Sequence, residues 1–161
     1  MAPHSNNIEL SLLPCYGDST IALLGKGHMT DKKSENYELN LAENFVQYTG
    51  SHIFLTGKAG TGKTTFLHKL KENTAKRMII TAPTGVAAIN AGGVTLHSFF
   101  QLPFGPFIPG SEASEQSRQR LYRFSQEKKR IIKSLDLLVI DEISMVRADL
   151  LDSVDAVLRR H

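Results

Sequence analysis

The feature that most constrains this chain of 161 residues is a run of eight, from Gly57 to Thr64, that reads GKAGTGKT. The run satisfies the pattern G-x-x-x-x-G-K-[ST], which wraps a glycine-rich loop around the phosphates of a nucleotide. Glycines are needed because the backbone must curl until successive N–H groups point at one phosphate. The pattern also requires an apolar strand before the loop and an amphipathic helix after it. Residues 52–56 (HIFLT) and the helix-spaced apolar residues after Lys63 meet that requirement.

This loop predicts an ATP site in which two residues have separate roles. Lys63 is expected to contact the β- and γ-phosphates, and the hydroxyl of Thr64 is expected to ligate Mg²⁺. A chance glycine turn is the alternative, and the flanking strand and helix argue against it. The residues assigned to nucleotide binding are Gly57, Lys58, Ala59, Gly60, Thr61, Gly62, Lys63, Thr64 and Thr65.

A second part of the site is predicted 78 residues after Lys63, where the apolar run Leu137 to Ile140 is followed by Asp141 and Glu142. An acidic residue at the carboxyl end of a buried parallel strand lies where such sheets bind ligands. We expect Asp141 to hold Mg²⁺ and Glu142 to polarise the attacking water as general base. The predicted catalytic residues are thus Lys63, Asp141 and Glu142. The alternative is that Asp141 only caps the following helix.

Strand and helix patterns alternate along the chain, which predicts an α/β fold with a parallel sheet covered by helices on both faces. Strands are expected at 52–56, 78–81 and 135–140, and helices at about 39–48, 63–72, 84–91, 117–134 and from an N-cap at Ser144 to the end. The domain organisation expected is a poorly structured extension at 1–28, a leading helix at 29–50 and the ATPase core at 51–161.

The composition, 41% hydrophobic and 22% charged residues, is that of a folded globular domain. No apolar run is long enough to cross a bilayer, and no secretory leader is visible, so we expect an intracellular protein of the cytoplasm, nucleoid or nucleus with no membrane partner. The formal net charge of +3 permits nucleic-acid binding without requiring it. The basic run at 118–133 admits two interpretations, a solvated helix face or a surface that approaches phosphates.

The segment between the two halves of the site resembles a known family. Residues 82–100, APTGVAAINAGGVTLHSFF, are similar to motif Ia and its sequel in superfamily 1 DNA helicases that move 5′ to 3′, most closely the PIF (petite integration frequency) type. The phosphate loop and the acidic motif at 141–146 (DEISMV) resemble those of the same family. The resemblance covers about residues 39–160, and 93–100 is its most specific part.

This resemblance implies a RecA-like P-loop NTPase domain, truncated after the acidic (Walker B) motif. The function implied is an ATP-dependent 5′-to-3′ DNA helicase that acts on single-stranded DNA and duplex junctions in DNA repair, recombination and genome or telomere maintenance, as a monomer. A hydroxyl and helix N-terminal amides after a strand can hold a DNA phosphate, and aromatic rings can stack on bases without sequence preference. The DNA-binding residues expected are Pro83, Thr84, Gly85, His97, Ser98 and Phe99.

Other features of the family pattern are missing. The resemblance implies a further strand between those ending at Thr56 and Ile140, and a second domain that supplies arginines, so the sheet is expected to lack a central strand. Gln47 is too near the loop to read adenine, which leaves Asn36 or Asn40. Two alternatives therefore stay open: a P-loop ATPase of the assembly-factor type, or an inactive helicase gene fragment.

Overall fold

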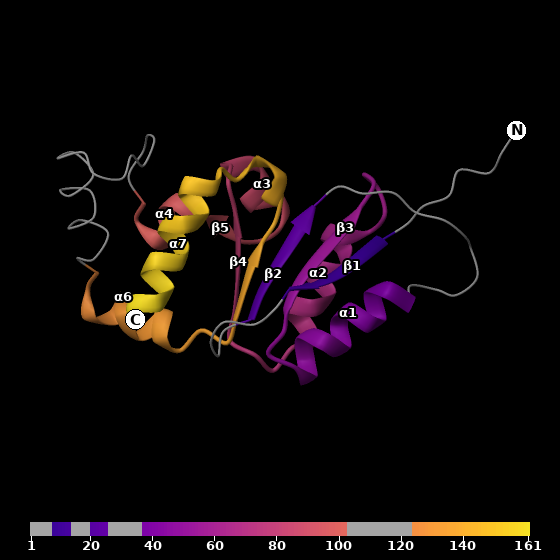
Figure 1. The fold of residues 1–161 in the computed structure, drawn as a ribbon, viewed down its shortest axis with the longest axis horizontal. Coiled ribbons are helices and arrows are strands. Elements are labelled where there is room, and N and C mark those ends of the chain that lie inside the picture. Colours follow the sequence, from indigo (N-terminus) through magenta and orange to yellow (C-terminus); the bar gives the residue numbers. More distant parts are fainter. Residues whose placement is uncertain (1–7, 14–19, 26–36, 103–123) are drawn as a thin grey trace, which may run out of the picture.

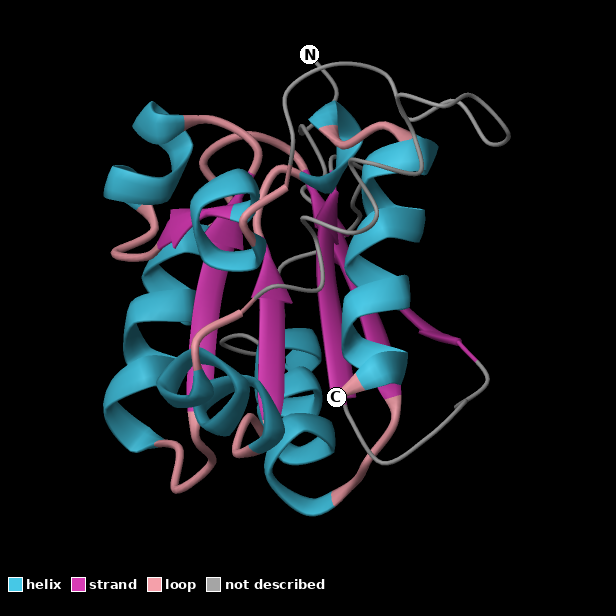
Figure 2. Ribbon diagram, turned by 90° about the vertical axis from the view of Figure 1, so that its left-hand side faces the viewer, coloured by secondary structure: helices cyan, strands magenta, loops and turns pink. Residues whose placement is uncertain are grey.

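A computed structural model describes residues 8–13, 20–25, 37–102 and 124–161 of the chain, and these form one layered α/β unit (Figure 1). In Figure 2 the strands form a central layer with helices on either side. Within these described ranges, no helix combines the length and apolar character needed to cross a membrane.

The sheet has six strands in the order β1-β3-β2-β6-β4-β5. Every pairing between neighbouring strands is parallel except that of β1 with β3, which is antiparallel, and β1 lies at one edge. The strands are β1 (Ile8–Leu13), β2 (Thr20–Gly25), β3 (His52–Gly57), β4 (Met78–Ala82), β5 (Val94–Thr95) and β6 (Leu137–Ile140).

The helices follow the strands much as the apolar spacing predicts. The strand and helix expected on the two sides of the phosphate loop are both present, as β3 and α2. The helices are α1 (Tyr37–Tyr48), α2 (Lys63–Asn73), α3 (Gly85–Asn90), α4 (Leu96–Phe100), α6 (Gln126–Lys133) and α7 (Ala148–Arg160), with a 3-10 turn, η1, at Ile143–Met145.

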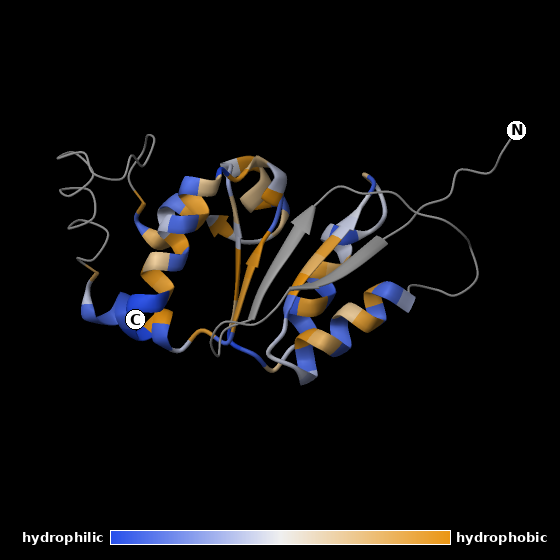
Figure 3. Ribbon diagram, viewed as in Figure 1, coloured by the Kyte–Doolittle hydropathy of each residue, from blue (hydrophilic) through white to orange (hydrophobic). Residues whose placement is uncertain are grey.

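Both faces of the sheet are covered, and β6 shows this most clearly because all four of its residues are buried. Leu137 and Val139 belong to the core shared with α1 and α2, whereas Leu138 and Ile140 belong to the core shared with α4, α6 and α7. Because side chains alternate along a strand, a strand buried on both faces must be apolar throughout. Figure 3 shows the result, with β4 and β6 mostly hydrophobic and α6 mostly hydrophilic. The predicted RecA-like α/β fold is confirmed.

The amino-terminal region differs from the expectation. We expected residues 1–28 to be poorly structured and the sheet to lack a strand between the one ending at Thr56 and the one ending at Ile140. Instead β2 lies between β3 and β6 and pairs in parallel with both. The scattered glycines of this region hid two six-residue strands, since short apolar segments carry little periodic signal. Of the leading helix expected at 29–50, residues 29–36 lie outside the described residues and α1 starts at Tyr37.

Two helix boundaries also differ from the prediction. Ser144 lies in η1 rather than at the start of the last helix, which begins at Ala148 after Arg147. The basic helix begins at Gln126, where the hydroxyl of Ser125 accepts a hydrogen bond from the backbone N–H of Lys128 and caps it. Residues 117–123 of the predicted helix lie outside the described residues.

One glycine is required by close packing. A Cβ built on Gly93 would lie 2.2 Å from the carbonyl oxygen of Ile80, on the neighbouring strand β4. We therefore expect Gly93→Ala to destabilise the fold by about 3 kcal/mol, because the backbone of β5 must move away from β4. Thermal or urea unfolding measures this loss. Gly50→Ala is the matched control, since nothing lies within 4 Å of the added Cβ. Equal stability of the two variants would contradict the packing described here.

Candidate ATP site and DNA-contacting surface

The phosphate loop leaves the carboxyl end of β3 and enters α2 with the backbone geometry that its glycines allow. Gly60 and Gly62 have φ angles of +80° and +88°, a region in which side chains other than glycine are strained. Gly62 is the N-cap residue of α2, so the loop delivers its backbone N–H groups at the positive end of that helix. This is a cradle for an anionic phosphate.

Lys63 lies over the loop that it follows. Its Nζ donates hydrogen bonds to the carbonyl oxygens of Gly57, at 2.6 Å, and Lys58, at 2.8 Å. A third, longer contact of 3.4 Å reaches Oγ1 of Thr61. The ammonium group is thereby held inside the curl of the loop, where a nucleotide phosphate would contact it.

The acidic pair leaves the carboxyl end of β6. Asp141 is half-buried, and its Oδ1 accepts a hydrogen bond of 2.9 Å from the backbone N–H of Glu142. Burial raises the pKa of Asp141 above its ordinary value, with a smaller increase from the charge of Glu142, while that backbone hydrogen bond and the charge of Lys63 oppose the rise. Because β3 and β6 both pair in parallel with β2, the loop and the acidic motif leave the same edge of the sheet.

Glu142 has a left-handed backbone, with φ +51°, which is uncommon for a residue other than glycine. Such strained positions gather at functional sites, where the surrounding structure holds them. Glu142 is also the N-cap residue of η1, so this conformation turns the chain from β6 into η1. The residue expected to act as base therefore stands at this turn, directly after Asp141.

The raised pKa of Asp141 gives a pH-dependent prediction. Because the folded chain holds the Asp141 proton more tightly than the unfolded chain, ionising this carboxyl at neutral pH costs stability. The contribution to stability is complete below the ordinary Asp pKa of 3.8 and is lost as pH rises through the raised folded value. We expect Asp141→Asn to raise the melting temperature at pH 7, and the gain to disappear below about pH 4.

Thermal melts across pH 3 to 8 measure this difference, and Asp152→Asn on the exposed side of α7 is the control. Asparagine can still accept the hydrogen bond from the Glu142 N–H, so the local structure is kept. A lower melting temperature for Asp141→Asn at pH 7 would contradict the interpretation that this carboxylate is held at a cost to stability.

The residues present fit a nucleotide with its Mg²⁺. Mg²⁺ is usually held by one or two protein oxygens together with substrate phosphates, rather than by a full protein cage. Thr64, exposed at the start of α2, and Asp141 supply a hydroxyl and a carboxylate at the shared edge. The described part of the chain contains no group of three or more His, Cys, Asp or Glu residues that could hold a metal ion.

A hollow of about 180 Å³ lies beside the loop, between α1 and the start of α2. Asn40 lines it together with Thr61 and Gly62 of the loop, and a salt bridge of 3.2 Å joins Glu43 and Lys69 at its wall. Gln47 is turned elsewhere, because its amide oxygen accepts a hydrogen bond from Thr74. Of the two residues considered for reading the base, Asn40 lines this hollow and Asn36 lies outside the described residues.

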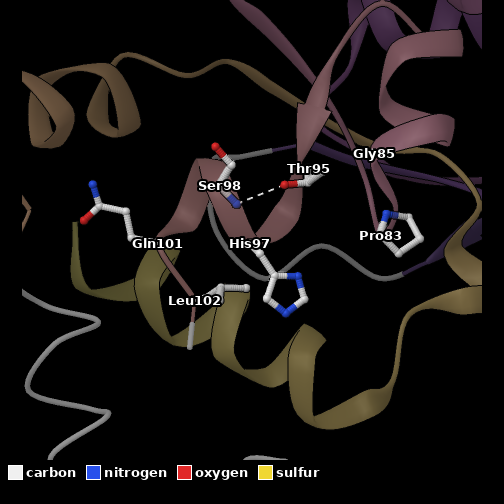
Figure 4. Close-up of a pocket in the computed structure, with 7 residues that line it drawn as sticks. All are labelled: Pro83, Gly85, Thr95, His97, Ser98, Gln101 and Leu102. Carbon is white, nitrogen blue, oxygen red and sulfur yellow. Dashed lines mark hydrogen bonds between the residues drawn. The ribbon is translucent and has the colours of Figure 1, made fainter. Parts of the chain in front are cut away.

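A second, larger hollow of about 480 Å³ lies where β4, β5 and α4 meet (Figure 4). Four of the six residues expected to contact DNA line it: Pro83, Gly85, His97 and Ser98. In Figure 4 the His97 imidazole lies between Leu102 and Pro83, and the Gln101 amide lies at the far end from Pro83. The segments 83–85 and 97–98 are thus brought together as the sequence predicts.

Thr84 and Phe99 are placed differently. The Thr84 hydroxyl caps α3 by accepting the N–H of Ala87 at 3.2 Å, which leaves its own O–H to donate to a ligand. Phe99 is only 6% exposed; its ring meets that of Phe100 edge-on, and Nζ of Lys128 lies 3.7 Å from its centroid. The prediction that Phe99 stacks on a base does not fit this burial, since a ring this little exposed offers no free face to a base.

The structure describes only part of the basic run at 118–133. Lys128 packs on Phe99, and burial lowers the pKa of its ammonium group, so this lysine belongs to the core edge rather than to a solvated face. Arg118, Arg120 and Arg123 lie outside the described residues.

Three residues that line the second hollow were missed by sequence reasoning: Thr95, Gln101 and Leu102. Thr95 caps α4 by accepting the N–H of Ser98 at 3.1 Å, a signal that a Thr before an apolar run could have given. Gln101 is the C-cap residue of the same helix and has a left-handed backbone, with φ +50°. The residues around it gave no reason to predict this conformation.

Known proteins resemble this chain over most of its length. A family model described as PIF1-like helicase matches residues 29–160. The chain is 36% identical over 137 residues to the ATP-dependent DNA helicase PIF1 of Saccharomyces cerevisiae (strain YJM789), which covers 80% of this chain and 14% of the yeast protein. It is similar to two crystal structures of Pif1 from Bacteroides, one in complex with ADP-AlF4 and one bound to ssDNA. Each has 38% identity and a TM-score of 0.57, covering 89% of this chain and 24% of the other.

The chain therefore spans 14% to 24% of the length of these relatives. The matched region nevertheless contains the whole phosphate loop, the acidic motif and the segment that lines the second hollow. The family model covers most of the chain. The two Bacteroides structures share its fold and are 38% identical to it in sequence. This chain belongs to the PIF1-like helicase family.

Proposed function

We propose that this chain carries the ATP-binding and part of the DNA-contacting machinery of an ATP-dependent DNA helicase. The observation that carries the proposal is that β3 and β6 both pair in parallel with β2, so the phosphate loop and the Asp141–Glu142 pair leave the same edge of the sheet. A loop for phosphates and a pair of acidic residues at the same edge are the two parts that ATP hydrolysis requires.

In this proposal each residue of the edge has one task. The amides of the loop and the ammonium of Lys63 bind and orient the phosphates, and Thr64 and Asp141 would hold Mg²⁺. When bound, Mg²⁺ supplies neutralisation of the charge that develops on the phosphates. Glu142 accepts a proton from the attacking water. Asn40, in the hollow beside the loop, is positioned to hydrogen-bond the base.

The second hollow supports single-stranded DNA as the partner. The Thr84 O–H and the backbone at Gly85 can hold a phosphate, and the His97 imidazole offers a face for a base. Bacteroides Pif1 has a crystal structure bound to ssDNA. Another structure concerns DNA unwinding at forked dsDNA by two coordinating Pif1 helicases. We extend the proposal to 5′-to-3′ movement and to repair, recombination and telomere maintenance, as the family resemblance implies.

The His97 contact gives a direct test of this partner. We expect His97→Ala to weaken binding of a single-stranded oligonucleotide by about 5- to 100-fold, the range for loss of one stacked base. Fluorescence anisotropy at low and moderate salt measures the change. His68→Ala is the matched control, because His68 is exposed on α2 and lies outside the second hollow. Equal affinities of the two variants would remove His97 from the DNA surface.

The 161-residue chain alone is expected to bind nucleotide weakly and not to unwind DNA. Arg147, Arg159 and Arg160 are on or next to α7 of the same domain, and Arg147 and Arg159 pair with Asp149 and Asp155. An arginine that reaches the γ-phosphate is worth about 10³–10⁵ in rate, and this chain spans only 24% of the Bacteroides Pif1 structure. Turnover is therefore best measured in a chimera in which residues 29–160 replace the matching segment of Bacteroides Pif1.

A further inference from the structure

The two halves of the ATP edge are joined by a strand from the amino-terminal region. Strand β3, which leads into the phosphate loop, pairs only with β1 and β2 among the described strands. Strand β6, which leads into Asp141, pairs only with β2 and β4. In the described sheet β2 is thus the only backbone link between the loop and the acidic motif (Figure 1).

The register of β2 aligns its two neighbours residue by residue. Ala22 pairs with Ile53 on one side and Val139 on the other, and Leu23 pairs with Phe54 and Ile140. Counting from the second row, the loop begins three residues after Phe54 and Asp141 directly follows Ile140. A slip of one residue on either side would shift the loop against the acidic pair by about 3.3 Å.

The chain between β2 and β3 is long enough for β2 to lie parallel beside β3. Residues 26–51 join β2 to β3 and include α1, so β2, α1 and β3 form the crossover unit that parallel neighbours need. The segment TIALLG is apolar apart from its first and last residues, as expected of a strand in the middle of a sheet covered on both faces. Its neighbours provide a matching apolar environment, because Ile53, Leu55 and all of β6 are buried.

We propose that the slot between β3 and β6 is an acceptor site for one parallel strand, that residues 20–25 fill it in cis, and that this filling sets the geometry of the ATP site. Residues 20–25 are then positioning residues, which act through the loop and the acidic pair rather than by touching nucleotide. Only the nucleotide readout rests on the function proposed above. The strand pairing itself can be tested without any ligand.

The test compares the full chain with a variant that lacks residues 1–28, and a variant that lacks only residues 1–7 is the control because it keeps both strands. The amides of Leu137 and Asp141 donate to β4, so alternation along the strand directs those of Leu138 and Ile140 toward β2. Hydrogen exchange at Leu138 and Ile140 therefore reports the pairing of β6 with β2, and a fluorescent ATP analogue reports the site. We expect loss of residues 1–28 to remove protection of the Leu138 and Ile140 amides, to leave the Leu137 amide protected by β4, and to weaken binding of the analogue by about 100-fold, roughly the loss of one or two hydrogen bonds to charged phosphates.

A second variant keeps the length of the chain. Ala22→Pro removes one N–H from the middle of β2, and proline is confined to sheet edges, so this change should act like the deletion. A synthetic peptide of residues 1–28, added during refolding of the shortened chain, should restore both readouts. Millimolar peptide is expected to be needed, because the tether in the intact chain supplies an effective concentration of that order. The same peptide with Ala22→Pro should restore neither.

The outcomes separate the two proposals. If the shortened chain keeps protected amides at Leu138 and Ile140 and its affinity for the analogue, the acceptor slot is wrong. The same holds if the shortened chain is unfolded and the wild-type peptide fails to restore it. If the full chain shows protected amides that depend on β2 but binds no analogue at any concentration tested, the slot stands and the proposed ATP site is wrong.

Discussion

Lys63→Ala is expected to weaken binding of an ATP analogue to this chain by about 100-fold, because hydrogen bonds between charged groups contribute about 1.5–3 kcal/mol each. The ammonium group of Lys63 is already held within the loop by the carbonyls of Gly57 and Lys58, so little reorganisation is needed for it to meet the phosphates. Isothermal titration or fluorescence of a labelled analogue measures the affinity.

Lys58→Ala is the matched control for Lys63→Ala. Lys58 is in the same loop and has the same charge, but the loop uses its backbone rather than its ammonium group in this account. We expect its affinity to stay within about threefold of the parent, in the range of an exposed charge pair. A thermal melt of each variant separates a binding defect from unfolding. Equal affinity of the Lys63 and Lys58 variants would overturn the assignment of the loop lysine.

Glu142→Gln is expected to reduce ATP turnover by about 10²- to 10⁴-fold while nucleotide affinity stays nearly unchanged. Glutamine has almost the same shape but cannot accept the proton of the attacking water. The metal side of the site remains, because Thr64 and Asp141 are untouched, and the Glu142 N–H still donates to Asp141. Turnover is measured in the chimera with Bacteroides Pif1 defined above, and affinity with a non-hydrolysable analogue.

Glu127→Gln, in the exposed first turn of α6, is the control for loss of one negative charge. It should leave both turnover and affinity close to those of the parent chimera. A fall in affinity that matches the fall in rate for Glu142→Gln would make Glu142 a metal ligand or a structural residue. The left-handed backbone at this position makes the second possibility a meaningful one to exclude.

The sequence predicted the two strands and the loop of the candidate ATP edge because each of these parts has a local signature. The phosphate loop needs glycines at fixed positions, and Gly60 and Gly62 do adopt the left-handed backbone that this requires. The acidic pair follows an apolar strand whose burial on both faces could be inferred from its composition alone. Prediction succeeded where chemistry and backbone geometry demand particular residues at short range.

The features that sequence reasoning missed depend on long-range packing. The apolar segment at 20–25 is a strand only because β3 and β6, more than 25 and 110 residues away in the chain, present edges for it to pair with. From the sequence, Phe99 could have been a ring that stacks on bases or a ring in the core. Its contacts with Phe100 and Lys128 show that it belongs to the core. Such partners leave no mark on the local sequence.

Residues 29–160, as proposed above, couple an ATP site to single-stranded DNA. This coupling can be measured as the ATPase rate of the chimera with and without a single-stranded oligonucleotide at low salt. We expect DNA to stimulate the rate about tenfold or more, the usual size of coupling between two sites, and most of this stimulation to be lost in the His97→Ala chimera. Equal rates with and without DNA, in a chimera that binds and hydrolyses ATP, would show that the two sites are not coupled.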